Sequence, residues 1–324
     1  MNHNIISPIA AALLVGFLVP VLSAQTVRLK VSAEQADIRR RPDIGSALVR
    51  QVPQGTILES EGKEVEPSSF RSYSFEVMGG GVYLAGGDPN RAARGTADYY
   101  RARLGILYNG RVGSAHLGPS AGLSFDYWIR PRIGIGVAVE VVYAGDDGLV
   151  TFRSGGREAQ LEIVPEIDSI PVRLHLVLSP IPDFVAKAGF EYHFARCRYL
   201  YRLTTADART EWKGDAKARG LGLFASISWE RPIFGPVSIL VEASGRFARV
   251  SGFKGTDVSK GPDGAATTEE GTLYFYTGKT EDGDSFPLMF VRERPPSEAG
   301  VFNPREALID LTGISLRTGL KIRF

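Results

Sequence analysis

Residues 311–324 read Leu-Thr-Gly-Ile-Ser-Leu-Arg-Thr-Gly-Leu-Lys-Ile-Arg-Phe, and this stretch decides the expected fold. Successive side chains of a β-strand point to opposite faces. In a strand, one face would carry Ile314, Leu316, Thr318, Leu320, Ile322 and Phe324, and the other would carry Gly313, Ser315, Arg317, Gly319, Lys321 and Arg323. One face is therefore apolar, and the other is cationic or small.

An amphipathic strand of this length that ends in Phe resembles the closing strand of bacterial outer-membrane β-barrels. The resemblance implies that the apolar face meets lipid and that the polar face fills the lumen. It also implies that outer-membrane assembly machinery binds the carboxy-terminal strand. The residues that close the barrel would be Leu316, Leu320, Ile322 and Phe324.

The same alternation recurs in seven earlier segments. They are residues 73–83, 117–129, 133–143, 170–178, 184–194, 221–230 and 237–247. Together with the last strand they make about eight, which is the smallest closed size of this class. The sequence therefore predicts an all-β fold, an eight-stranded antiparallel up-and-down transmembrane β-barrel similar to the small OmpA/OmpX-type barrels, preceded by a small β module.

The connections between these segments alternate in length. Short turns marked by proline occur at 130–132, 179–183 and 231–235. Long polar connections occur at 85–116, 145–169, 196–219 and 251–310. This alternation is typical of barrels with tight periplasmic turns and extended surface loops. A soluble lipocalin-like barrel is the alternative, with its apolar face inside and its charges outside.

If the polar face points inward, the lumen receives charges of both signs in nearly equal number. These residues are Glu76, Asp126, Glu140, Arg173, Lys187, Glu191, Glu230, Glu242, Arg246, Arg317, Lys321 and Arg323. The interior of an eight-stranded barrel is just wide enough for side chains to fill. Because unpaired buried charges are costly, we expect a salt-bridged plug rather than an open pore, with a narrow solute channel as an alternative.

The amino-terminal part differs from the barrel. Residues 1–24 contain an apolar run that ends at small residues and predict a cleaved signal peptide. The segment Ala36-Asp-Ile-Arg-Arg-Arg-Pro42, with Pro53-Gln-Gly-Thr56 after it, resembles the first half of a bacterial Src-homology-3-like domain. We therefore expect a partial module over 25–67, in the periplasm, and the barrel over 68–324. The resemblance implies peptidoglycan as a partner of the module.

Several candidates for chemistry compete with a structural role. His116 with Ser114 and Ser120 nearby predicts, as an alternative, a lipid-modifying enzyme such as a lipid A deacylase or acyltransferase. Cys197 lies beside Arg196 and Arg198, which would lower a thiol pKa, or it is an inert buried thiol. The Arg-rich segments 91–103 and 196–202 either pair with lipopolysaccharide phosphates or form solvated tops of the strands.

Charge and composition narrow the function further. A net charge of +2, from 38 basic and 36 acidic residues, does not predict a nucleic-acid partner. A single cysteine excludes an internal disulfide. We expect no cofactor, no metal and no enzymatic activity. The expected protein lies in the outer membrane of a Gram-negative-type bacterium, contacts its lipids and lipopolysaccharide, and has a structural or adhesive role.

Overall fold

The computed structural model describes residues 27–30, 35–39, 48–53, 57–60, 72–104, 106–154, 157–181, 183–280 and 282–324. The chain divides into two compact units, Met1–Ser69 and Phe70–Phe324. The expected signal peptide lies outside the described residues. Within the described residues, no helix is long and apolar enough to span a membrane.

The first unit contains two antiparallel strand pairs. β1 (Val27–Lys30) pairs with β4 (Ile57–Ser60), and β2 (Gln35–Arg39) pairs with β3 (Leu48–Pro53). All four strands lie within residues 25–67, where the sequence predicts a small β module. The Src-homology-3-like character of this unit stays a prediction.

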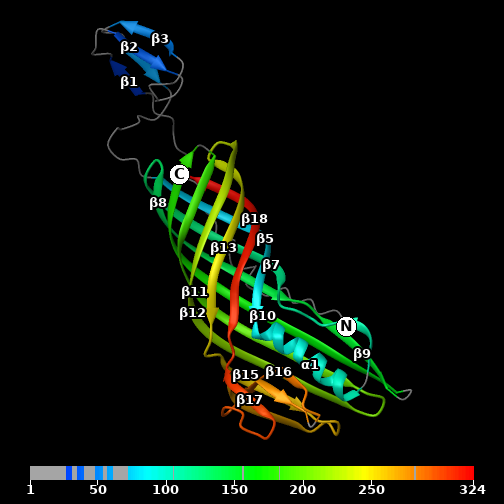
Figure 1. Ribbon diagram of the computed structural model, residues 1–324. Coiled ribbons are helices and arrows are strands. Elements are labelled where there is room, and N and C mark those ends of the chain that lie inside the picture. Colours follow the sequence, from blue (N-terminus) through cyan, green and yellow to red (C-terminus); the bar gives the residue numbers. More distant parts are fainter. Residues whose placement is uncertain are drawn as a thin grey trace. The chain divides into compact units, whose positions relative to one another are not determined.

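The second unit is built on a closed ring of eight strands (Figure 1). In ring order these are β5 (Ser72–Gly87), β7 (Leu117–Arg130), β8 (Ile133–Gly145), β10 (Arg157–Ile181), β11 (Phe184–Thr204), β12 (Arg209–Phe234), β13 (Val237–Val250) and β18 (Ile309–Arg323). Each strand pairs antiparallel with the next, and β18 pairs with β5. Two backbone hydrogen bonds between Tyr73 and Phe324 close the ring at one end. The predicted fold class is confirmed.

The orientation of the side chains separates the membrane barrel from the lipocalin-like alternative. On β18, Leu316 is 64% exposed and Leu320 is 51% exposed, whereas Arg317 and Lys321 are 2% and 1% exposed. The same outward apolar face recurs on every ring strand. On β11 it runs from Phe184 to Phe194. Ten steps of roughly 3.3 Å along a strand tilted by about 40° rise roughly 25 Å, which is the height of a lipid-facing band of about 25 Å.

We call this band of outward apolar side chains, Phe184 to Phe194 on β11, the apolar belt. Beyond it, on the side away from Phe324, the polar and apolar faces of the same strands are exchanged. Beyond Phe194, the outward positions of β11 carry Arg196, Arg198 and Arg202, and its inward positions carry the buried Cys197 and the buried tyrosines 199 and 201. A strand whose charges face outward and whose apolar side chains face inward is surrounded by water. The reversal therefore marks the upper boundary of the membrane.

The long connections are not the extended loops that the sequence analysis expects. The connection at 196–219 is the top of the β11–β12 hairpin, and β10 begins at Arg157. The remaining connections contain α1 (Asp88–Leu104), β6 (Ile106–Arg111), β9 (Gly148–Ser154), β14 (Lys254–Lys260), β15 (Ala266–Lys279), β16 (Ser285–Arg292) and β17 (Val301–Glu306). We call these elements, with the parts of β10–β12 beyond the belt on the side away from Phe324, the head, which is drawn at the lower end of the barrel unit in Figure 1.

The head has its own apolar core. Helix α1 packs against β16 and β10 and buries Ala92, Ala93 and Ala97. Gly95 permits this close approach, because a Cβ there would lie 1.9 Å from the Pro287 carbonyl oxygen. The core of the head is therefore continuous with the inward face of the upper ring strands.

Candidate functional site: the ion-paired lumen

The inward face of the membrane ring carries the twelve charged residues that the sequence analysis places there. Ten of them are buried, Glu230 is partly buried and Arg323 is exposed. Each of the twelve has an opposite charge within 4.0 Å. They form two groups, each with three acids and three bases.

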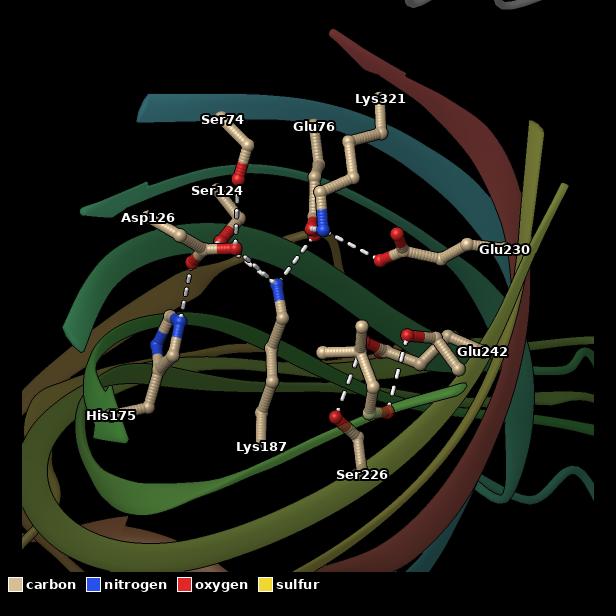
Figure 2. Close-up of polar contacts among 12 residues, drawn as sticks. Ser74, Glu76, Ser124, Asp126, His175, Lys187, Ser226, Glu230, Glu242 and Lys321 are labelled. Atoms are coloured by element: carbon tan, nitrogen blue, oxygen red, sulfur yellow. Dashed lines mark hydrogen bonds and ion pairs between the residues drawn. The ribbon is translucent and has the colours of Figure 1, made fainter. Parts of the chain in front are cut away.

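The first group, the Lys187 cluster, consists of Glu76, Asp126, Lys187, Glu230, Lys321 and Arg323. Lys187 Nζ lies 2.6 Å from Glu76 Oε2 and 3.0 Å from Asp126 Oδ2 (Figure 2). Lys321 Nζ bridges Glu76 Oε1 at 3.1 Å and Glu230 Oε1 at 2.5 Å. Each lysine thus forms ion pairs with two carboxylates from different strands, and the cluster ties β5, β7, β11, β12 and β18 together.

Trp128 and His175 complete this cluster. The buried Trp128 ring lies under the Arg323 guanidinium at 4.6 Å and near Lys321 Nζ at 5.3 Å. His175 Nε2 is 2.8 Å from Asp126 Oδ1. Gly136 leaves the space for this contact, because a Cβ there would lie 2.3 Å from Asp126 Oδ1.

The second group, the Glu140 cluster, consists of Glu140, Arg173, Glu191, Glu242, Arg246 and Arg317. Glu140 Oε2 lies 2.9 Å from Arg246 Nη2 and 3.0 Å from Arg317 Nη1, and it also pairs with Arg173. Arg173 Nε reaches Glu191 Oε1 at 2.6 Å, and Arg317 also pairs with Glu242. A single carboxylate is therefore shared by three arginines, and the other two carboxylates balance the charge.

His193 is fully buried on the lumen face, and the sequence pattern does not identify its partners. Ser169 Oγ is 3.0 Å from His193 Nδ1, and His193 Nε2 is 3.1 Å from Glu191 Oε2. This order of hydroxyl, imidazole and carboxylate resembles that of a hydrolase triad. All three side chains are at most 1% exposed, and Glu191 also pairs with Arg173. These contacts lie inside the closed ring and join Ser169 of β10 to His193 and Glu191 of β11.

His116, the candidate base of a lipid-modifying enzyme, has other contacts. Its Nδ1 lies 2.8 Å from the Leu84 carbonyl oxygen, and its ring stacks on Tyr83 at a centroid distance of 5.4 Å. Asn90 Nδ2 is 3.3 Å from the ring nitrogens. Among the described residues, no serine hydroxyl or carboxylate is hydrogen-bonded to this histidine. The structure therefore does not bring His116 together with Ser114 or Ser120.

Cys197 is not the activated thiol that its neighbours in sequence suggest. Its side chain is fully buried in the head, whereas Arg196 and Arg198 point outward from the same strand. Burial raises the pKa of the Cys197 thiol well above its ordinary value. Adjacent residues of a strand face opposite sides, so the two arginines do not lie beside the thiol. Cys197 is therefore the inert buried thiol of the second alternative.

The head holds one buried polar contact that the sequence pattern does not reveal. Tyr199 Oη donates to Asp257 Oδ2 at 2.5 Å and accepts a hydrogen bond from the Val291 amide at 3.0 Å. Burial raises the pKa of both Tyr199 and Asp257. Gly214 makes room for the tyrosine ring, since a Cβ there would lie 2.1 Å from it. This contact links β11, β14 and β16 inside the head.

Ring closure, the outward apolar belt and the paired inward charges define the chain as a transmembrane β-barrel. No protein-family model and no curated protein matches the sequence.

Among solved structures, the chain is similar to the outer membrane protein OprG from Pseudomonas aeruginosa, with 10% identity and a TM-score of 0.38 over 79% of this chain and 97% of that chain. It is also similar to a major outer membrane protein from Thermus thermophilus, with 13% identity and a TM-score of 0.37 over 78% of this chain and 99% of that chain. The outer membrane protease OmpT from Escherichia coli shows 8% identity and a TM-score of 0.28 over 81% of this chain and 99% of that chain.

Proposed function

We propose that the chain is an outer-membrane protein of a Gram-negative-type bacterium, in which the barrel is a closed anchor and the head has a structural or adhesive, surface-binding role. The observation that supports this proposal is the pairing of all twelve lumen charges. Charges removed from water are tolerated when each has a partner. A lumen filled by two balanced clusters leaves no continuous row of free charges for an ion to follow.

The same geometry disfavours a general porin. Large aqueous channels occur in barrels of about 16 strands, whereas about eight strands leave room for side chains alone. An ion crossing this lumen would have to separate Lys187 from Glu76 and Asp126, and Arg246 and Arg317 from Glu140. The head has its own apolar core outside the membrane. In this proposal it is the part of the barrel unit that binds other surfaces.

Planar-bilayer recording on the full chain tests the closed lumen. We expect no stable large-conductance openings at concentrations at which an open porin, inserted in parallel, conducts. Heat-modifiable gel mobility of the same preparation reports whether the protein is folded. Reproducible nanosiemens openings from folded protein would contradict the proposal, and small uniform steps would favour the narrow solute channel.

The proposed placement assigns partners to the carboxy-terminal strand and to the amino-terminal module. Tyr73 and Phe324 meet at one end of the ring, which we assign to the periplasm because the short turns lie at that end. The carboxy-terminal strand would bind the assembly machinery, and the module over 25–67 would bind peptidoglycan. Co-sedimentation of the full chain with purified peptidoglycan, with and without residues 25–67, tests the second assignment.

A further inference from the structure

Most outward-facing arginines just above the belt are paired with carboxylates. Arg196 Nε lies 2.7 Å from Asp215 Oδ1, and Arg198 Nη2 lies 2.8 Å from Asp168 Oδ2. Arg202 pairs with Glu211 and with Glu162. Internal carboxylates therefore already pair with these guanidinium groups, and the phosphate contact through 196–202, one of the two alternatives from the sequence, stays a prediction.

Three basic residues beside them have no such partner. Lys217 and Arg219 on β12 and Lys254 on β14 are exposed, and no carboxylate of the described residues lies within 4.0 Å of them. Lys217 and Lys254 are direct register partners on the same face. Like charges directly opposite each other on neighbouring strands are destabilising. An anion bound between Lys217 and Lys254 would relieve this repulsion.

These three residues lie at the edge of the apolar belt. Arg219 is the register partner of Phe194, where the apolar belt ends on β11, and its guanidinium lies 5.5 Å from the Phe194 ring centroid. Leu221, the next outward residue of β12 toward the membrane, is 72% exposed. An anion bound at this height would belong to the headgroup layer and its acyl chains to the belt below.

The outer surface between β11 and β12 is hollowed beside Phe194 and Arg219. A shallow pocket of about 280 Å³ is lined by Phe194, Ala195, Arg196, Lys217, Ala218 and Arg219. The main chain at Ala195 and Ala218, whose side chains alternate to the inward face, forms the floor between the outward side chains. The pocket therefore offers Lys217 and Arg219 as charge-assisted donors to one phosphate group. Phe194 lies on its membrane side, and Lys254 lies next to Lys217 on β14, outside the lining of the pocket.

We propose that Lys217, Arg219 and Lys254 bind the phosphate of an anionic glycolipid of the outer leaflet, whose acyl chains lie along Leu221 and Phe194. The inference rests on the proposed outer-membrane placement and adds a specific lipid-binding site to the barrel unit. The lipid neutralises the Lys217–Lys254 pair, and Arg219 supplies a further donor held by its contact with Phe194.

The test measures binding of bisphosphorylated lipid A to the full chain in detergent micelles by native mass spectrometry. We expect one retained lipid per wild-type protein. K217A/K254A should bind at least about tenfold more weakly, since about 1.4 kcal/mol per factor of ten is less than two charged hydrogen bonds supply. K217R/K254R should keep the binding.

The matched control removes two lysines from the same strands. Lys213 on β12 and Lys260 on β14 are exposed and lie four and six residues farther from the belt. K213A/K260A should bind within about twofold of wild type, as expected for distant screened charges. Dephosphorylated lipid A should bind weakly to every variant.

Equal losses in K217A/K254A and K213A/K260A would overturn the proposal, as would unchanged binding in K217A/K254A. Displacement of lipid A by inorganic phosphate alone would also overturn it, because the site would then recognise a free anion. Heat-modifiable mobility of each variant is recorded in parallel. A folded barrel that does not bind lipid A refutes only this site, whereas a chain that never forms a heat-modifiable barrel refutes the proposed placement.

Discussion

Replacing Glu140 by glutamine tests whether the lumen is held by charge balance. Glu140 is 1% exposed and is shared by Arg173, Arg246 and Arg317. Arg173 and Arg317 keep other carboxylates in the variant, namely Glu191 and Glu242. Arg246 has Glu140 as its sole carboxylate partner among the described residues, so the substitution leaves this guanidinium buried and uncompensated. The side-chain volume is nearly unchanged, which isolates the loss of charge.

Breaking a buried ion pair by removing one partner costs about 3–5 kcal/mol, because an uncompensated charge stays in a low-dielectric site. We therefore expect E140Q to lower the free energy of unfolding by about that amount. The measurement is urea unfolding of the protein in lipid vesicles, followed by tryptophan fluorescence. E162Q, which removes a partner of the part-exposed Arg202 in the head, should cost less than about 1 kcal/mol.

A double-mutant cycle decides whether charge is the cause. Arg246→Met in the E140Q background restores equal numbers of acids and bases in the Glu140 cluster. The double variant should then be more stable than the sum of the two single effects predicts, by at least about 1 kcal/mol. Strictly additive effects, or an E140Q variant as stable as wild type, would refute the argument that paired ions hold this lumen.

Three further outcomes follow from the packing. Gly136→Ala should cost about 1–3 kcal/mol by overpacking against Asp126, whereas Gly245→Ala, which has open space around it, should be nearly neutral; urea unfolding measures both. Cys197 should resist a thiol reagent in the folded protein and react on unfolding, because it is buried and burial raises its thiol pKa. Burial raises the pKa of the Tyr199 and Tyr201 hydroxyls above their ordinary value of 10.0. The folded head keeps protons that the unfolded chain loses, so its stability is full below about pH 10 and falls at higher pH. Tyrosinate absorbance of wild type and Y199F checks this, and early ionisation of Tyr199 without unfolding would contradict it.

The membrane part of the fold could be predicted because one physical rule governs every strand there. Between lipid and a narrow lumen, each second side chain must be apolar, so a period of two persists over β5, β7, β8, β10–β13 and β18. The charged residues of the lumen follow from the same alternation. Their individual partners do not follow, because the ring joins residues such as Glu140 and Arg246 that are far apart in sequence.

The head could not be predicted because its sequence is polar and because its side chains do not alternate between two uniform surroundings, as those in the membrane do. The segment 91–103 is rich in Arg and Tyr, which indicates a loop, yet Ala92, Ala93, Gly95 and Ala97 give α1 a small-residue face that packs closely on β16. The period of two also continues through 196–204, with the polarity of the faces exchanged. A change of polarity at constant period is the signal that would have located the membrane boundary.

The exchange of faces on continuous strands also limits what a ligand at the head can do to the barrel. β11 passes from the belt into the head within one strand, and its hydrogen-bonded register with β12 is unbroken from Thr204 to Phe184. No hinge separates the two regions on this hairpin, so a displacement of its top would have to shear the register or separate the ion pairs of Lys187 and Arg173 below. Each of those pairs is buried, and breaking one costs several kcal/mol. The coupling free energy between two binding sites is typically about 1–3 kcal/mol, which is too small to break such a pair. Binding at the head is therefore expected to leave the lumen closed, and in the proposed function the barrel would serve as a rigid support for the head.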